Sequence, residues 1–287
     1  MAGLLIASGA HLSAHAYTAT GDRQFPATIL LPQIGPSDEA YLTGATLPSA
    51  GNPGGPDGRD SSFAATVDKT VTDRLSVMMT VQYSAIDPGG GPTATGWQNI
   101  TAAAQFTLLA DPQHEFLLSV GVQQEFPGTG AARVGASRQG ATMPAVFFGK
   151  GFGDLDVGLF RPFAIAGYAG YNAAAGGPRV STWNSGFLVE YSIPYLEANV
   201  RTLDMPDLLR NVTPMVEVSM TNPVGGTGGP ATMVIGPGFN YAGAGWDFGI
   251  EALVPASRAA GAGLGVTAQL HIQLDYLFPT SVGKPLF

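Results

Sequence analysis

A strict alternation of apolar and polar residues is the feature that most constrains the fold of this 287-residue chain. Between Gly265 and Tyr276, every second residue from Val266 onward is apolar, and the residues between them are small or polar. Successive side chains of a strand point to opposite faces, so this segment is predicted to be one long strand with an apolar face and a polar face. Either a protein core or lipid must cover the apolar face.

The same period of two recurs along the chain and predicts an all-β protein. We expect twelve strands, at residues 38–47, 61–71, 74–86, 96–109, 114–126, 143–151, 161–172, 181–193, 212–222, 231–241, 246–256 and 263–277. Their connections alternate between longer segments rich in glycine and proline and mostly tight turns. Transmembrane barrels show this asymmetry, with long loops on one rim and short turns on the other. The predicted fold is therefore a single antiparallel up-and-down transmembrane β-barrel.

One connection on the short-turn side breaks the pattern. Pro194–Asn211 has helical spacing in two pieces around Pro206. We expect a short helical turn on the periplasmic side at this place. This turn would either fill the lower rim of the barrel or dock a partner protein.

Composition favours lipid over a protein core. Only 12% of the residues are charged, whereas a water-facing surface carries roughly 25–35% charged residues. A soluble barrel of the lipocalin type also alternates, with its apolar side inward, but its outer surface would need more charge than this chain has. The pattern therefore predicts apolar side chains facing acyl chains, a polar lumen, and a location in the outer membrane of a Gram-negative cell.

Six aromatic residues fall near the predicted strand ends, and amphipathic rings prefer the interface between membrane and water. We expect the following residues to contact membrane lipid at the two interfaces: Tyr83, Trp97, Trp183, Tyr241, Trp246 and Tyr276.

The N-terminal region is predicted to lie outside the barrel. Residues 1–16 contain a short apolar run followed by Ala14-His15-Ala16, a small-x-small pattern typical of signal-peptide cleavage. A basic segment at the start is missing, and an unstructured N-terminus is the alternative. We expect residues 17–36 to form a periplasmic segment and residues 37–287 to form the barrel with a short C-terminal tail.

Several runs of residues carry a resemblance to a known family. They are His114–Val122, Pro127–Gly130, Phe147–Leu155, Arg161–Ala164 and Leu277–Phe287, with Ser37–Glu39 near the start. Together they resemble an uncharacterised family of exported bacterial β-barrel proteins, which are often labelled outer-membrane or transport proteins. The resemblance spans most of the chain after Phe25 and implies a barrel and an outer-membrane location. It brings no substrate and no catalytic residue, and the short signal peptide departs from the family pattern.

Charge and cysteine content exclude several functions. The net charge of −8 argues against nucleic-acid binding, which needs a basic surface. The chain has no cysteine, and therefore no disulfide and no thiolate metal site. No pattern predicts a cofactor or a metal site, and Gly149–Asp154 lacks the context of a phosphate-binding loop. We predict no enzymatic activity; a lipid-modifying enzyme that uses His271 is the third alternative.

The polar face holds the residues that are predicted to line the lumen. They are Glu125, Lys150, Arg161, Glu190, Glu217, Glu251, Gln269, His271, Gln273 and Asp275. Their charges either pair and fill the barrel, or line a water-filled path with more acid than base. Charged rings bias which ions pass a pore, so an acid excess favours cations or basic solutes. The loop Pro127–Thr142 is expected to fold inward as a constriction.

The function that we expect is passive passage of a small solute through the outer membrane. The alternative is a closed structural or interaction barrel with a filled lumen, which docks a partner through its loops or through residues 194–211. The sequence does not specify the solute, the state of the lumen, the oligomeric state or a protein partner.

Overall fold

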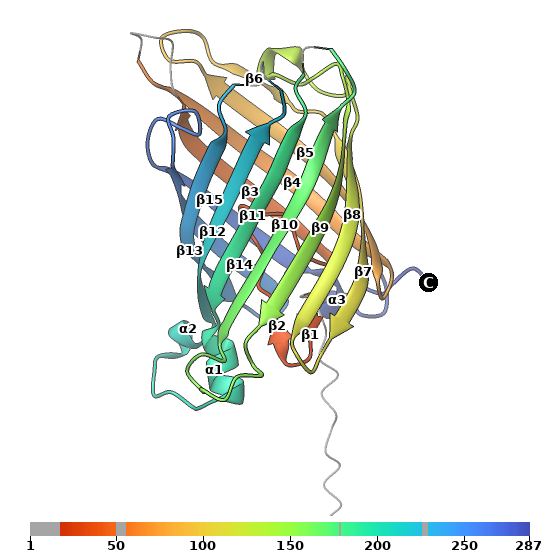
Figure 1. Cartoon of the computed structure of the whole chain (residues 1–287), viewed down its shortest axis with the longest axis vertical. Coiled ribbons are helices and arrows are strands. Elements are labelled where there is room, and N and C mark those ends of the chain that lie inside the picture. The colour runs from red at the N-terminus through yellow and green to blue at the C-terminus, as the bar shows by residue number, and fades with distance from the viewer. Residues whose placement is uncertain (1–17, 50–55, 178, 226–228) are drawn as a thin grey trace, which may run out of the picture.

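The computed structural model describes residues 18–49, 56–177, 179–225 and 229–287. Within these residues, twelve antiparallel strands close into a barrel (Figure 1). They are β3 (Glu39–Ser49), β4 (Gly58–Thr72), β5 (Leu75–Asp87), β7 (Thr101–Asp111), β8 (Phe116–Glu125), β9 (Ala141–Gly151), β10 (Phe163–Ala174), β11 (Thr182–Tyr191), β12 (Val212–Pro223), β13 (Thr232–Ala242), β14 (Trp246–Pro255) and β15 (Gly265–Gln273). The predicted all-β, up-and-down barrel is confirmed, and each predicted strand overlaps one of these twelve.

The barrel closes where β15 pairs with β3, with Leu270 opposite Leu42. The strand expected at residues 96–109 is divided in two: a short strand, β6 (Ala94–Trp97), extends the rim beside β5, and β7 follows. Between them, the backbone N–H of Ile100 donates a hydrogen bond to the Thr129 hydroxyl instead of to a neighbouring strand. This contact with the next loop interrupts the ladder locally.

The two rims differ in their connections, as predicted. On the short-turn rim, β4 and β5 are joined by Asp73–Arg74, and β13 and β14 are joined by residues 243–245. At the other rim, the described connecting residues form loops, at the top of Figure 1, whereas residues 152–162 and 192–211 form the two longer connections of the short-turn rim. Among the described residues, no helix is long and apolar enough to cross a bilayer.

The predicted helical turn lies on the short-turn rim, between β11 and β12. It consists of α1 (Ile193–Asn199) and α2 (Asp207–Arg210). The hydroxyl of Ser192 caps α1 by accepting a hydrogen bond from the backbone N–H of Tyr195. A third helix, α3 (Leu274–Leu277), follows β15 at the same rim.

The apolar side of the strands faces outward. In β15, the side chain of Leu270 is 37% exposed, whereas His271 and Gln273 on the other face are 1% and 4% exposed. Phe63 of β4 and Met79 of β5 are each more than half exposed. Because the closed barrel turns these apolar side chains away from its own interior, lipid rather than a protein core covers them.

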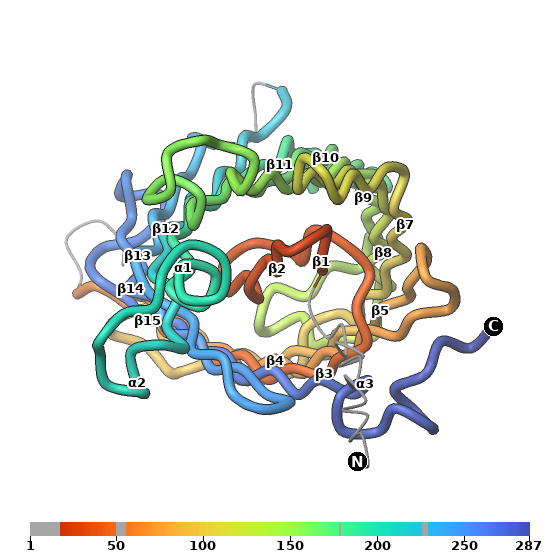
Figure 2. Tube along the Cα trace, turned by 90° about the horizontal axis from the view of Figure 1, so that it is seen from below, coloured from red at the N-terminus to blue at the C-terminus, as the bar shows by residue number. Residues whose placement is uncertain are grey.

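The N-terminal segment lies inside the barrel rather than below it: it falls within the ring of strands in Figure 2, and its apolar residues pack against the inner wall. It begins with a small hairpin of β1 (Ala19–Thr20) and β2 (Arg23–Gln24) and then crosses the lumen to reach β3. We call residues 18–36 the plug. The expected signal peptide, residues 1–16, lies outside the described residues.

Apolar side chains explain why the plug enters the lumen. Below the barrel they would face water, and inside they bury apolar area, which is favourable by about 25 cal/mol per Å². The buried cluster consists of Phe25, Ile29, Leu31 and Ile34 of the plug and of Leu117, Ala145, Phe147, Ala164, Ala166, Leu188 and Met215 of the barrel wall. The inner face of β8 to β12 is therefore apolar where the plug packs, and it differs from the uniformly polar lumen that alternation predicted.

Candidate functional site

An arginine fastens the plug at the short-turn rim. The side chain of Arg23 is fully buried, and its terminal nitrogens donate hydrogen bonds to three backbone carbonyls of residues 161–163, at 2.6–3.2 Å. Its Nε atom lies 3.3 Å from a carboxylate oxygen of Glu115. The ring of Tyr195 lies 4.0 Å below the guanidinium group, a distance at which cations and aromatic rings attract.

Glu115 supports this contact from a strained backbone conformation. Within the described part of the chain, it is the single non-glycine residue with a positive φ, at 48°. Its carboxylate accepts hydrogen bonds from the Tyr195 hydroxyl at 2.8 Å and from the Gly153 N–H at 2.9 Å. Burial and the hydrogen bond to Glu115 raise the pKa of Tyr195 to about 12, so this hydroxyl remains a donor. Strain of this kind persists where the surroundings fix the residue.

A carboxylate in the middle of the barrel holds the backbone of the plug. Glu217 of β12 is fully buried and accepts hydrogen bonds from the backbone N–H groups of Ile29, Leu30 and Leu31, at 2.8–2.9 Å. The side-chain amides of Gln105 and Asn240 donate to backbone carbonyls of the plug. Buried backbone groups need partners, and these side chains supply them where the plug has no neighbouring strand.

Two more inward carboxylates lie on the same side of the lumen. Glu190 of β11 lies 3.8 Å from Arg23. Glu251 of β14 is buried, and its oxygens accept no hydrogen bond from the described residues. Like Glu217, both residues are buried, and none of the three lines the cavities that follow.

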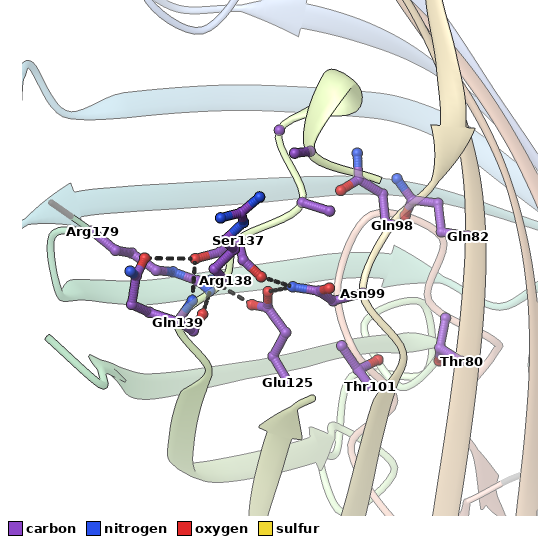
Figure 3. Close-up of a pocket in the computed structure, with 13 residues that line it drawn as sticks. Thr80, Gln82, Gln98, Asn99, Thr101, Glu125, Ser137, Arg138, Gln139 and Arg179 are labelled. Atoms are coloured by element: carbon purple, nitrogen blue, oxygen red, sulfur yellow. Dashed lines mark hydrogen bonds and ion pairs between the residues drawn. The ribbon is translucent and has the colours of Figure 1, made fainter. Parts of the chain in front are cut away.

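A cavity of about 760 Å³ occupies the lumen at the long-loop rim (Figure 3). Inward residues of β5, β7 and β8 form one side of it, and the β8–β9 loop, with a short 3-10 turn at Ala132–Val134, folds into the lumen and forms the other. The polar lining consists of Thr80, Gln82, Gln98, Asn99, Thr101, Glu125, Ser137, Arg138, Gln139 and Arg179. We call this space the outer cavity.

Below the outer cavity, the lumen narrows beside the plug. A space of about 40 Å³, which has room for about three water molecules, is lined by Pro32 and Gln33 of the plug and by inward residues such as Met78 and Ala103. We call this space the constriction. Its lining carries no charged side chain.

A third cavity, of about 470 Å³, opens at the short-turn rim. Its lining includes three carboxylates, those of Asp38, Asp73 and Asp275, and one guanidinium group, that of Arg74. We call this space the inner cavity. Lys69 forms an ion pair with Asp38 beside it.

The three cavities follow the same strands from rim to rim. Along β5 and the turn before it, the lining runs from Gln82 through Met78 to Arg74, and along β7 it runs from Thr101 through Ala103 to Thr107. The apolar core between the plug and the wall lies on β8 to β12, and Leu117, Ala145 and Phe147 border both this core and a cavity. The lumen therefore has one filled side and one side on which cavities succeed one another, with a narrow middle.

Two of the residues predicted to line the lumen lie elsewhere. Lys150 lies on the outer face of β9, because Gly149 and Gly151 occupy the inward positions beside it, and its ammonium group lies 3.0 Å from Asp154. Arg161 lies in the β9–β10 connection and donates a hydrogen bond to a backbone carbonyl at 2.7 Å. Neither base meets the inward carboxylates, and Arg23 of the plug takes that role.

The remaining predicted lumen residues divide into two groups. Glu125 lines the outer cavity and pairs with Arg179 at 2.5 Å, and Asp275 of α3 lines the inner cavity. Glu190, Glu217, Glu251, Gln269, His271 and Gln273 face inward and are buried. The sequence reasoning did not identify Arg23, Glu115, Arg138 or Arg179; the apolar run Phe25–Ile34 was the available sign that the plug needs burial.

His271 is enclosed within the inner wall. Its Nδ1 lies 2.7 Å from a carboxylate oxygen of Glu39, its Nε2 lies 2.6 Å from the amide oxygen of Gln269, and its ring stacks on Tyr41 at 4.6 Å. Both ring nitrogens are therefore engaged by the wall. Across the ranges that the structure describes, no three histidine, aspartate or glutamate side chains are grouped as metal ligands.

The six predicted interface aromatics form two groups at the ends of the barrel. Tyr83 and Trp97 contact each other edge to face at the long-loop end, where Trp183 also lies. Tyr241 and Trp246 stack at the short-turn end. Tyr276 of α3 belongs to the same end and is half exposed. Two such belts are typical of transmembrane barrels.

A closed barrel with an apolar outer surface, aromatic residues at both ends and a lumen with polar cavities is an outer-membrane β-barrel. The long loops then face the exterior of the cell, and the short turns, the plug entrance and α1 to α3 face the periplasm.

Comparison with solved structures gives the same fold. The chain is similar to the COG4313 outer membrane channel from Pseudomonas putida F1, at 10% identity and a TM-score of 0.59, over 87% of this chain and 99% of that chain. It also matches the KdgM porin, at 8% identity and a TM-score of 0.48 over 81% and 98% of the two chains. LpxR from Salmonella typhimurium matches at 8% identity and a TM-score of 0.46, over 81% and 99%. No protein-family model and no curated protein matches the chain.

Proposed function

We propose that the protein is a passive outer-membrane channel for small solutes, with a path that runs beside the plug along β5, β7 and β8. The observation that carries this proposal is the succession of the outer cavity, the constriction and the inner cavity along the same strands. Core packing and buried hydrogen bonds hold the plug against the opposite wall. The proposed path therefore needs no removal of the plug, and the constriction limits its width.

The constriction offers a direct test of the channel. Ala103 faces the constriction, whereas Ala102 lies opposite the exposed Met79 and faces lipid. A tryptophan at position 103 would fill a space of about 40 Å³. In planar lipid bilayers, we expect a small steady conductance from the wild type, a loss of most of it in Ala103→Trp, and wild-type conductance in Ala102→Trp.

Two outcomes would contradict the channel. One is a wild type that does not conduct ions, and the other is an equal conductance of the two tryptophan variants. The proposal assigns the protein no catalytic step.

A closed barrel is the second candidate, and the buried fastening of the plug by Arg23 and Glu217 favours it. In a closed barrel, the plug fills the lumen permanently, and the loops or residues 194–211 dock a partner. Removal of residues 18–36 separates the two candidates. A closed barrel would conduct only after this removal, whereas the proposed channel conducts before it and conducts more after it.

A further inference from the structure

The walls of the outer cavity are held in place by the protein itself. The side-chain amide of Asn99 donates to the Glu125 carboxylate and to the Ser137 carbonyl, at 2.7 and 2.8 Å. The side-chain amide of Gln98 donates to the Val134 carbonyl at 2.8 Å. These bonds fix the inward loop over the cavity, and Figure 3 shows the two that Asn99 makes. A solute would therefore meet a formed site, which lowers the ordering cost of binding.

One cation of the outer cavity is left for a ligand. Arg179 is engaged, because it pairs with Glu125 and donates to the Gln139 carbonyl at 3.2 Å. Arg138 also lines the cavity, and it forms no hydrogen bond or ion pair with the described residues. Two guanidinium groups against one carboxylate give the lining an excess of one positive charge. A free guanidinium group binds a carboxylate through two parallel hydrogen bonds.

The neutral groups of the cavity complement hydroxyl groups. Within the described residues, the amide oxygens of Gln82 and Gln98 accept no hydrogen bond, and the Thr101 hydroxyl has no partner, although all three residues line the cavity. Amide oxygens accept from hydroxyl donors, and a threonine hydroxyl both donates and accepts. The cavity volume of about 760 Å³ falls within the range of about 300–1,000 Å³ for small-molecule sites.

We propose that the outer cavity binds small solutes that combine one carboxylate with several hydroxyl groups, of the size of a sugar acid. The role of this site in delivering solute to the pore rests on the proposed channel function, whereas binding of the solute in the outer cavity does not. The lining residues face the lumen, so a free solute rather than a lipid headgroup reaches Arg138. Such solutes are anions, whereas the acid excess in the sequence predicted cations or basic solutes. The two differ because Glu190, Glu217 and Glu251 lie outside the cavity.

The test is direct binding to the purified full-length protein in detergent, measured by isothermal titration calorimetry. The probes are D-glucuronate, D-glucose as the same ring without the carboxylate, and acetate as the carboxylate without the ring. We expect glucuronate to bind at least tenfold more tightly than either. Arg138→Gln should weaken glucuronate binding by about ten- to a hundredfold, the range for loss of a charge-assisted hydrogen bond. Arg258→Gln, in another loop of the same rim and outside the outer cavity, should bind like the wild type.

The outcomes separate this proposal from the channel. Equal binding of glucose and glucuronate by the wild type, or equal affinity of Arg138→Gln and Arg258→Gln, would overturn the site. Selective glucuronate binding by a protein that does not conduct would keep the site and overturn the channel. A conducting wild type without glucuronate binding would keep the channel and overturn the site.

Discussion

Glu217 and Arg23 show how charged residues are accommodated inside this barrel. A buried carboxylate or guanidinium group costs several kcal/mol unless hydrogen bonds compensate it. Glu217 receives three backbone N–H groups, and Arg23 binds three carbonyls and Glu115. Both residues gain these partners only when the plug is in the lumen, so their compensation stabilises the docked plug.

Replacing Glu217 should therefore loosen the plug. Hydrogen bonds to a charged acceptor contribute about 1.5–3 kcal/mol each, and Glu217→Gln keeps the size of the side chain but removes the charge. We expect a loss of about 2 kcal/mol in plug docking. The measurement is trypsin cleavage after Arg23, whose side chain is buried in the docked state and must leave its site to enter the protease. When cleavage is slow compared with redocking, its rate is proportional to the fraction of molecules with an undocked plug. A loss of about 2 kcal/mol should then make cleavage about thirtyfold faster.

Glu251→Gln is the matched control for this variant. Glu251 is equally buried on a nearby strand, and its oxygens accept no hydrogen bond from the described residues. Its replacement should leave the cleavage rate unchanged. Equal rates for Glu217→Gln and the wild type would show that this carboxylate does not hold the plug.

The alternation of apolar and polar residues correctly predicted many of the inward-facing side chains. The residues that it missed have a physical explanation. Glu190, Glu217, Glu251 and His271 follow from a period of two, because the strand register is unbroken around them. Arg23 could not be found in this way, because its hydrogen-bond partners lie 92 to 140 positions away in the sequence. Such contacts depend on the closed barrel and not on local pattern.

At the scale of elements, the strands were predictable and the plug was not. Each barrel strand has one face toward lipid and one toward the lumen, and this difference appears as alternation. The plug has no such faces: its apolar run contains Pro26 and Pro32, and it pairs with side chains rather than with strands. An apolar run next to predicted strands nevertheless indicates a segment that must be buried. In a barrel of this kind, the lumen is the place where this run can be buried.

The C-terminal element should respond to pH. Burial, followed by the charges of Asp38 and Glu39, raises the pKa of Asp275 in α3 from 3.8 to about 6. Asp275 therefore binds its proton more tightly when α3 is packed against the barrel than when this C-terminal segment has come loose. This difference stabilises the packed C-terminal segment in full at pH values below 3.8, the ordinary pKa of aspartate. The stabilisation is lost as the pH rises through about 6. We expect residues 274–287 to be less protected at pH 7 than at pH 5.

Hydrogen exchange of residues 274–287, corrected for its intrinsic pH dependence, measures this effect. Asp275→Asn carries no titratable group at this position and should give equal protection at both pH values. A wild type without a difference between pH 5 and pH 7, or a variant that keeps the difference, would exclude Asp275 as the cause.

At the scale of the whole molecule, the lumen has two sides with different roles. The inner face of β8 to β12 and the plug form a compact, partly apolar core, and β5, β7 and β8 border the three cavities. The sequence indicated a polar lumen but not this division, because the division arises only when the plug packs on one wall. The wider cavities also differ in charge: the lining of the outer cavity has a positive excess, and that of the inner cavity has a negative excess.

Accessibility of single cysteines to a water-soluble thiol reagent tests this division most directly, because the chain has no cysteine of its own. The four variants are Thr101→Cys and Ala103→Cys on the cavity side, and Leu188→Cys and Met215→Cys under the plug. In protein reconstituted into lipid vesicles, we expect the first two cysteines to react and the last two to stay protected. An unreactive cysteine at position 103, or labelling at positions 188 and 215 as fast as at 101, would contradict a path beside the plug.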